Sequence, residues 1–311
     1  SGRISGSFNA YDANSSELLL ERELPSDTGF NSYIDNVGQI STRGLEASIE
    51  TVNLIAGDFQ WRTNFNISFQ RSEVDELLPD DNEIIVDPDD NPGVDGGGIF
   101  RVGEPISQYR YVRYAGVNPA TGAAMYLDRN GNLTYNGQRQ EDEVLLGNTE
   151  PDFFGGFGNT FTFKGVSLDV FFQYDYGRET LNNDAFFLRS NTFFYLNRDE
   201  EVLDYWKEPG DITDTPRPTP AASYSGQAAG IFTTRYYEDA SYIRLKRAKL
   251  GYSLPQSLLE RVSLSAASVF VQGENLVTFT EYTGFDPEVV GTGLGQYPQS
   301  RRYTVGLSIT Y

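Results

Sequence analysis

The sequence predicts an all-β protein made of long antiparallel strands, and three observations favour this fold class. Several segments alternate between apolar and polar residues, which is the period of a strand with two different faces. The connections between these segments are short at some places and long at others. No run approaches the ~18 apolar residues that a transmembrane helix requires. We therefore expect strands, rather than helices, to form the body of the protein.

Nine strands are expected within the 311 residues. Most are close to the ~9–11 residues with which a tilted strand crosses a bilayer, whereas a typical strand of a soluble domain has ~5–6 residues. The expected strands span residues 2–12, 37–51, 58–71, 105–116, 152–164, 166–177, 241–254, 263–274 and 301–311. Residues 2–12 already read as a strand at the beginning of the sequence.

The strands at 58–71 and 166–177 have the clearest two-faced patterns. In the first, one face collects Phe59, Trp61, Thr63, Phe65, Ile67 and Phe69. Its other face is entirely polar and holds Gln60, Arg62, Asn64, Asn66, Ser68 and Gln70. In the second, apolar and aromatic residues alternate with Ser167, Asp169, Gln173 and Asp175, interrupted by Phe171. Both patterns predict a strand between an apolar and a polar environment.

The last strands add two further features. Residues 241–254 change phase in the middle, and a β-bulge near Lys246–Arg247 would reconcile the two halves. The basic residues of this strand are expected either to line a lumen or to lie at a lipid headgroup region; they are Arg244, Lys246, Arg247 and Lys249. Residues 301–311 alternate to the end of the sequence, with Tyr303, Val305, Leu307, Ile309 and Tyr311 in one phase.

The connections fall into two classes. Tight turns are expected near 56–58, 164–166 and 255–261. Long connections are expected at 13–36, 72–104, 117–151, 178–240 and 275–300. Short periplasmic turns at one end and long extracellular loops at the other are the layout of an outer-membrane barrel, and a compact soluble domain seldom has so many long loops. The sequence thus predicts a portion of a transmembrane antiparallel β-barrel.

The composition excludes several classes of function. The chain has 24 Lys and Arg against 44 Asp and Glu, for a net charge of −20, which argues against nucleic acid as a partner. It contains no cysteine and no histidine, so thiolate or histidine-based catalysis and His- or Cys-ligated zinc have no residues to use. Paired carboxylates for glycoside hydrolysis cannot be singled out. We expect no catalytic residue and no enzyme.

Five segments resemble the SusC/RagA-type TonB-dependent transporters. The stretches NVGQISTRGLEASIE (36–50) and SYIRLKRAKLGYSLP (241–255) are similar to strands of that family. The stretches VFVQGENLVTFTEYTGFDPEV (269–289) and YPQSRRYTVGLSITY (297–311) are similar to its last segments. The stretch LGNTEPDFFGGFGNTFTFKGVSLDVFFQYDYG (146–177) is similar to a characteristic hairpin of the same family. Together they follow the family order across most of the chain.

The resemblance implies a fold, a place and a set of partners. Family members are barrels of 22 strands in the outer membrane of Gram-negative bacteria of the Bacteroidota type, filled by a plug. They import oligosaccharides or peptides under a SusD-like surface lipoprotein, and the TonB complex acts through an N-terminal box. The aliphatic face then meets lipid or lipopolysaccharide. The terminal strand, with Tyr303, Val305, Leu307, Ile309 and Tyr311, resembles an assembly signal.

The sequence departs from the family pattern in one respect. Plug, TonB box and the first barrel strands have no counterpart here, so residues 1–311 are interpreted as a C-terminal portion of the barrel. By phase alone, five residues are expected to face the lumen: Arg62, Asn64, Asn66, Asp169 and Asp175. A passive porin, and a soluble β-rich carbohydrate-binding protein, remain as alternative readings.

The loops hold three further candidate features. A helix is expected at 197–207, where Tyr205 and Trp206 either contact substrate or lipoprotein or pack within the loop. The spacing of Asp128, Asn130 and Asn132 matches the start of a calcium-binding loop. The later Gly and Glu are missing, however, and the Asn-Gly pair favours a turn between short strands instead. Residues 72–100 hold ten acidic and no basic side chains, read as either a calcium site or a solvated loop. No other cofactor is expected.

Overall fold

The fold is described from a computed structural model. The structure describes residues 2–23, 29, 32–78, 82–86, 98–106, 108–137, 139–190, 197–218, 233–288 and 297–311. Six carboxylates of the acidic 72–100 segment lie outside these residues, namely Asp80, Asp81, Asp87, Asp89, Asp90 and Asp95.

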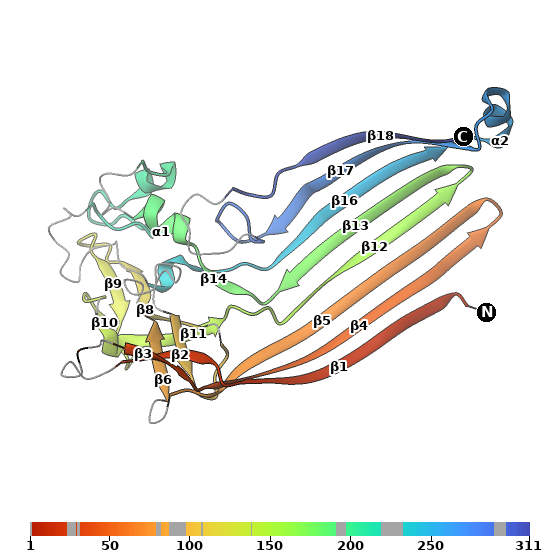
Figure 1. The fold of residues 1–311 in the computed structure, drawn as a ribbon. Coiled ribbons are helices and arrows are strands. Elements are labelled where there is room, and N and C mark those ends of the chain that lie inside the picture. The colour runs from red at the N-terminus through yellow and green to blue at the C-terminus, as the bar shows by residue number, and fades with distance from the viewer. Residues whose placement is uncertain are drawn as a thin grey trace.

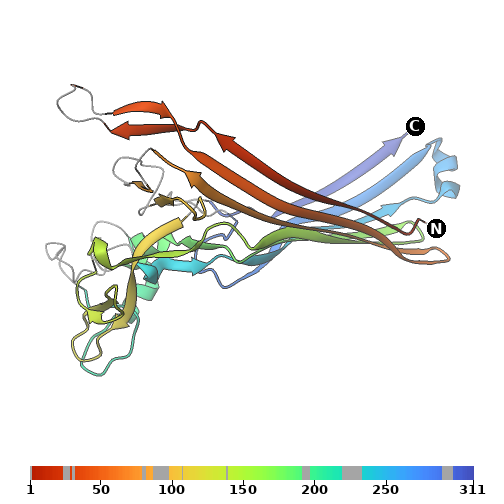
Figure 2. The same ribbon diagram turned by 90° about the horizontal axis from the view of Figure 1, so that it is seen from below.

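An eight-stranded antiparallel sheet, here called the wall, forms the body of the protein (Figure 1). Its strands follow one another in chain order: β1 (Ile4–Ser16), β4 (Gln39–Ala56), β5 (Phe59–Glu76), β12 (Phe153–Phe163), β13 (Val166–Tyr176), β16 (Tyr242–Ser253), β17 (Ala266–Thr280) and β18 (Arg302–Thr310). Within the described residues β1 and β18 do not pair with each other, so the sheet is open. Figure 2 shows its curvature and twist.

The two ends of the wall differ as expected. Both chain termini and the short connections lie at one end in Figure 1, called here the turn end. The hairpin between β12 and β13 needs only Lys164 and Gly165, both with positive φ (46° and 87°), the backbone conformation that matches strand twist. β16 and β17 are joined by α2 (Gln256–Leu259) and η5 (Glu260–Val262). The described parts of the long connections gather at the opposite, loop end.

The strand register separates the wall into an apolar and a polar face. Residues paired across antiparallel strands lie on the same side of a sheet. One row across seven strands joins Ser7, Ser48, Asn66, Gly156, Gln173, Arg244 and Thr278. The adjacent row, on the other side, joins Phe8, Ala47, Ile67, Gly155, Tyr174, Ile243 and Phe279. The predicted alternation therefore continues from strand to strand.

The predicted β-bulge in β16 is confirmed. The pairing of β16 with β13 shifts between Phe171 and Phe172, and its pairing with β17 shifts between Leu245 and Arg247. Lys246 is the extra residue. As a result Ile243 and Leu250 share the apolar face, while Arg244 and Arg247 share the polar face.

A second region, the loop-end region, stands beyond the wall. It contains a six-stranded sheet of β6 (Glu83–Val86), β7 (Gly98–Arg101), β8 (Gln108–Val117), β9 (Ala124–Leu127), β10 (Leu133–Thr134) and β11 (Glu143–Asn148). Two small pairs accompany it, β2 (Leu19–Glu23) with β3 (Ser32–Asn36) and β14 (Glu179–Leu181) with β15 (Tyr237–Asp239). Its short helical segments are α1 (Asn183–Arg189), η2 (Gln140–Asp142), η3 (Glu200–Asp204) and η4 (Thr234–Tyr236).

Two expectations were wrong here. The strand expected at 105–116 exists as β8 but belongs to the loop-end sheet, so the wall has eight described strands and not nine. Its neighbouring residues Tyr111 and Val112 are both buried, because β8 is covered on both faces. The helix expected at 197–207 is only the 3₁₀ turn η3, which ends where Tyr205 becomes extended (φ −76°, ψ 157°). Within the described ranges, no helix has the length and apolar content needed to span a bilayer.

Candidate functional site

The polar face of the wall ends in a cavity of about 600 Å³ at the loop end. Strands β5, β13 and β16 contribute Gln70, Gln173, Asp175 and Tyr242 to its lining. The loop-end region adds Tyr109, Glu150, Arg178, Glu179 and Glu288, among others. The cavity therefore lies where wall and loops meet, and its charged lining is mostly acidic.

Asp175, near the end of β13, forms an ion pair with a residue that follows closely in the chain. Its carboxylate accepts a hydrogen bond of 2.7 Å from Nη2 of Arg178, three residues later, and Asp175 is only 6% exposed. Next to it, Nε2 of Gln173 donates to the Tyr242 hydroxyl at 2.9 Å. These contacts fix the wall side of the cavity, since each buried polar group has a partner.

Glu179 supplies a carboxylate from the other side. It begins β14, directly after Arg178, and its Oε2 lies so close to Gly147 that a Cβ there would collide with it. Burial, and then the charges of Asp239 and Asp152, raise the pKa of Glu179 above its ordinary value. A cation entering the cavity would favour the ionised form again.

A buried ion-pair cluster, here called the latch, ties the last loop to the wall beside the cavity. Arg244 on β16 reaches Asp286, and both side chains are almost fully buried, at 3% and 4% exposed. Its Nη1 donates to Glu288 at 2.6 Å, and Lys246 also contacts Glu288 at 2.7 Å. Burial opposes ionisation of Asp286, but hydrogen bonds from Arg244 and two backbone amides lower its pKa.

The latch joins segments that the sequence resemblance had picked out separately. Arg244 and Lys246 belong to residues 241–255, and Asp286 and Glu288 belong to residues 269–289. Oδ2 of Asp286 also accepts a hydrogen bond from the backbone of Gln299 at 2.7 Å, within 297–311. Three of the five motifs therefore share one contact point. The remaining basic residues of β16 also lie on the polar face, where Arg247 pairs with Asp169 and Lys249 stacks on Phe270.

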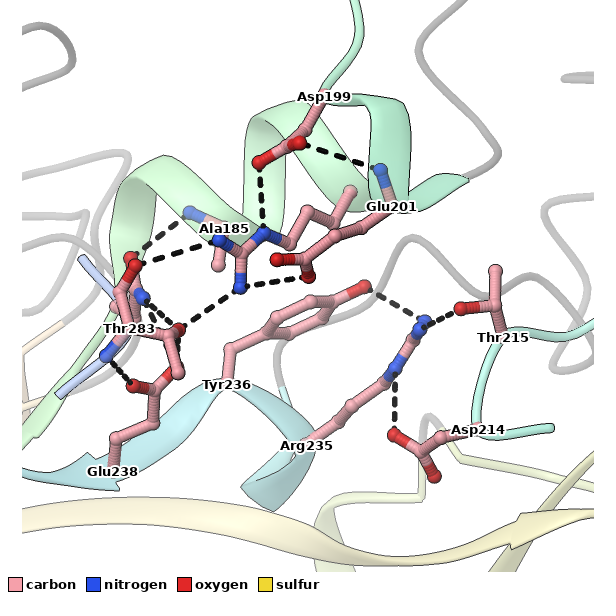
Figure 3. Close-up of polar contacts among 11 residues, drawn as sticks. Ala185, Asp199, Glu201, Asp214, Thr215, Arg235, Tyr236, Glu238 and Thr283 are labelled. Carbon is pink, nitrogen blue, oxygen red and sulfur yellow. Dashed lines mark hydrogen bonds and ion pairs between the residues drawn. The ribbon is translucent and has the colours of Figure 1, made fainter. Parts of the chain in front are cut away.

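The loop-end region is braced by a second polar cluster, shown in Figure 3. The guanidinium of Arg235 binds the hydroxyls of Tyr236 and Thr215, at 3.1 and 3.0 Å. Arg189 at the end of α1 binds Asp199 and Glu201, both at 3.2 Å. These contacts hold α1, η3 and η4 together around a small polar cavity of about 280 Å³.

The five residues predicted to face a lumen lie on the polar face but are not gathered in one place. Arg62 and Asp169 belong to one row near the turn end, joined through Thr160. Asn64 and Asn66 lie further along β5, and only Asp175 lines the loop-end cavity. Their role in lining a solute path stays a prediction.

Trp206 and Tyr205 pack within the loop-end region. The indole Nε1 of Trp206 donates to the Pro119 carbonyl at 2.9 Å, and its ring lies over Gly122. Gly122 has φ +70° and no room for a Cβ, which explains the glycine. Lys207 stacks on the Tyr205 ring at 5.5 Å. Contact of either ring with substrate or lipoprotein stays a prediction.

Asp128 closes the turn between β9 and β10. Its Oδ1 accepts hydrogen bonds from the backbone amides of Asn130 and Asn132, both at 2.8 Å, and these bonds lower its pKa. This Asx-type turn accounts for the Asp-x-Asn-x-Asn spacing. In the part of the chain that the structure describes, no three acidic side chains are grouped to hold a metal ion.

The residues of the expected assembly signal lie along β18 and just beyond it. Tyr303, Val305 and Leu307 are 72%, 83% and 64% exposed, on the apolar face. Ile309 continues this face and Tyr311 follows the strand. Their recognition by an assembly machinery stays a prediction.

Sequence reasoning missed Arg178, Glu179 and Glu288. A signal existed for the first two, because charged residues follow β13 immediately in Asp175-Tyr-Gly-Arg-Glu179, at the junction of wall and loop. Glu288 could not be found in this way, because its partners Arg244 and Lys246 are about forty residues away in sequence.

Comparison with known proteins gives a consistent set of relatives. No protein-family model matches the chain. It is 32% identical over 340 residues to TonB-dependent receptor P3 of Formosa agariphila, covering 99% of this chain and 32% of that protein. It is 26% identical to TonB-dependent receptor SusC of Bacteroides thetaiotaomicron, covering 100% of this chain and 30% of that protein. The chain thus spans about a third of the curated relatives it matches.

A solved structure matches as well. The RagAB peptide transporter superposes with a TM-score of 0.84 at 30% sequence identity, over 99% of this chain and 34% of that chain. The same peptide importer in its open-open state gives a TM-score of 0.84 over 33% of that chain. The match therefore includes both the wall and the loop-end region.

Proposed function

Since the chain belongs to the SusC/RagA-type family of TonB-dependent receptors, which are outer-membrane transporters and not enzymes, we propose that it forms part of the barrel of a nutrient importer. Residues 1–311 are assigned to the C-terminal part of that barrel, with the plug and the TonB contact outside this chain. This assignment is supported by the resemblance of residues 297–311 to the terminal strand of the family.

The separation of the two wall faces is the observation that carries this proposal. Ten residue steps separate Phe59 from Phe69 on the apolar face of β5. At ~3.4 Å per step they extend about 34 Å along the strand, or about 24 Å across a membrane at a tilt of ~45°. This agrees with the apolar band of ~25 Å on outer-membrane barrels. The apolar face is assigned to lipid and the polar face to the solute path.

A peptide is the favoured solute, with an oligosaccharide as the alternative. Two observations support the peptide. A solved structure similar to this chain, the RagAB transporter, is named a peptide transporter. The loop-end cavity also presents Asp175, Glu179 and Glu288 against Arg178, an arrangement that suits the amino terminus or a basic side chain of a peptide.

The loop end is assigned to the cell exterior, where a SusD-like lipoprotein would close over it. Long extracellular loops and short periplasmic turns are the usual layout of such barrels. The similarity to the RagAB transporter supports a two-component assembly. The loop-end region, with its own packed cores, offers a folded surface for such a lid.

Uptake by the full-length transporter tests the solute assignment. Replacing Asp175 and Glu179 by Asn and Gln removes two charge-assisted contacts of ~1.5–3 kcal/mol each, so uptake of a labelled lysine-containing peptide should fall at least about tenfold. Glu260→Gln, at the turn end, is the matched control. Unchanged peptide uptake in the double variant would contradict the cavity assignment. Full uptake without TonB would indicate a passive pore instead.

A further inference from the structure

We propose that the loop-end rim of the apolar face binds a phosphorylated acyl lipid of the outer leaflet, of the lipid A type. Arg43 and Arg71 hold its phosphate, and an acyl chain lies against Ala10, Leu45 and Phe69. The inference rests on the proposed function in one point, that this face meets the bilayer.

The two arginines are neighbours on one side of the sheet. Arg43 on β4 is directly opposite Arg71 on β5, and the next row on the same face pairs Leu45 with Phe69. Like charges directly opposite each other in a sheet are destabilising. Asp12 and Asp152 each compensate one of these charges. A phosphate that contacts both guanidinium groups compensates both at once, and its oxygen pair matches the planar donors of arginine.

The ion pairs of these arginines leave donors for a ligand. Nε of Arg43 contacts Asp12 at 3.2 Å, with both side chains well exposed, at 69% and 61%. Arg71 donates to the Pro151 carbonyl at 2.9 Å and contacts Asp152. Among the described residues, the two terminal nitrogens of Arg43 make no hydrogen bond or ion pair. Exposed ion pairs contribute only about 0–1 kcal/mol, so a lipid phosphate can replace them.

An apolar hollow lies directly below the arginines. Its volume is about 700 Å³, and it is lined by Ala10, Leu45 and Phe69 together with the charged row above them. Leu45 and Phe69 are 47% and 43% exposed. One pleat repeat of two residues, or about 7 Å, separates the arginine row from this floor. This is the order in which a lipid presents its headgroup phosphate and its chain.

The position in the membrane selects the lipid over a free anion. Phe69 is the last apolar residue of the lipid-facing band on β5, and Arg71 is the first charged residue beyond it on that face. The row therefore lies at the headgroup level of the leaflet on the loop-end side, which the proposed function assigns to the exterior. A soluble anion would use the arginines but not the apolar floor.

Binding of purified lipid A to the full-length transporter in detergent, measured by native mass spectrometry, tests the proposal. The variant Arg43→Gln/Arg71→Gln should bind lipid A at least about tenfold more weakly, as expected for loss of two arginine–phosphate contacts. The variant Arg43→Lys/Arg71→Lys should retain part of the affinity, because the charge remains. Dephosphorylated lipid A should bind the wild type as weakly as it binds the Gln variant.

A matched control exists on the opposite face. Arg302 and Arg247 are 71% and 47% exposed, close to the 69% and 48% of Arg43 and Arg71. Arg302→Gln/Arg247→Gln should bind lipid A like the wild type. Equal binding by the Arg43/Arg71 variant, or displacement of lipid A by inorganic phosphate, would overturn the proposal. Failure of the proposed function would instead appear as absence of the wild-type transporter from the outer membrane or loss of its uptake.

Discussion

The wall and the loop-end region treat their apolar residues in opposite ways. In the wall, Phe8, Val305 and Leu307 are 69%, 83% and 64% exposed. In the loop-end region, Tyr126 and Tyr236 are 1% and 3% exposed, within small cores built on β8 and α1. The loop-end region therefore buries apolar residues in its own core, whereas the wall exposes its apolar face to its surroundings. Such a face is favourable only when an apolar environment covers it.

The latch links the last loop to the wall and gives the largest expected effect. Arg244→Met leaves Asp286 and Glu288 without their buried partner, which should lower the free energy of unfolding by about 3–5 kcal/mol. Thermal unfolding of the purified transporter measures this loss. Arg247→Met, in the more exposed pair with Asp169, should cost only about 0–1 kcal/mol. Equal losses would mean that the latch is not a buried ion pair.

A cavity in the core of the loop-end region should destabilise that region and leave the wall intact. Phe186→Ala opens a cavity beside Tyr236 and should cost about 3–5 kcal/mol locally. Proteolysis should then cut the loop-end region while the transporter still reaches the outer membrane. Leu203→Ala, at a position 69% exposed, serves as the control and should change proteolysis little. Loss of membrane assembly with Phe186→Ala would show that the regions do not fold separately.

The wall should be sensitive to charge on one face only. Ile67→Arg places a charge inside the apolar band, one pleat repeat from its edge at Phe69. It should cost part of the about 2–4 kcal/mol that such a charge costs at the middle of a bilayer, so less transporter should reach the outer membrane. Asn66→Arg, the adjacent residue on the polar face, should assemble normally. Fractionation followed by blotting measures both variants. Normal assembly of Ile67→Arg would show that the two faces do not differ in their tolerance of charge.

The smallest expected effect is a pH dependence of stability caused by Glu179, where the wall meets the loop-end region. Burial and nearby carboxylates raise the pKa of Glu179 in the folded protein, so the folded state binds its proton more tightly than the unfolded state. Stability should therefore increase as the pH falls from neutral through this raised pKa. Glu179→Gln should be more stable than the wild type at neutral pH, with a difference that shrinks on acidification. A difference independent of pH would exclude ionisation of Glu179 as its cause.

The sequence predicted the wall far better than the loop-end region, for a physical reason. Each wall strand lies between two different environments, so its pattern of period two is visible in residues 59–70 alone. Even the bulge at Lys246 follows from the phase change. β8 is buried on both faces, so its sequence has no continuous alternation to indicate that it belongs to the loop-end sheet and not to the wall. α1 had a local signal, because Asn182 caps it and Asp184 lies in its first turn, but this signal was overlooked.

The candidate site was predictable only in part. The polar phase of β13 predicted Asp175 on the polar face, where the strand register has it. For the basic residues of β16 the sequence left two places open, a lumen and a headgroup region. The partners of these residues come from distant segments, as Glu288 does for Lys246. Trp206 could be picked out from the sequence as an aromatic residue in a loop. Its hydrogen bond to the Pro119 carbonyl could not, because Pro119 is distant in the sequence.

A single-cysteine scan of β5 tests the central claim most directly, and the absence of cysteine from this chain makes it practicable. Cysteine is placed in turn at residues 64–69 of the full-length transporter, freed of other reactive thiols, in its membrane. Positions 65, 67 and 69 should be quenched by lipid-phase nitroxide when labelled, and 64, 66 and 68 should react with a water-soluble maleimide. Equal behaviour of the two sets would contradict a wall with one face in lipid and the other along a solute path.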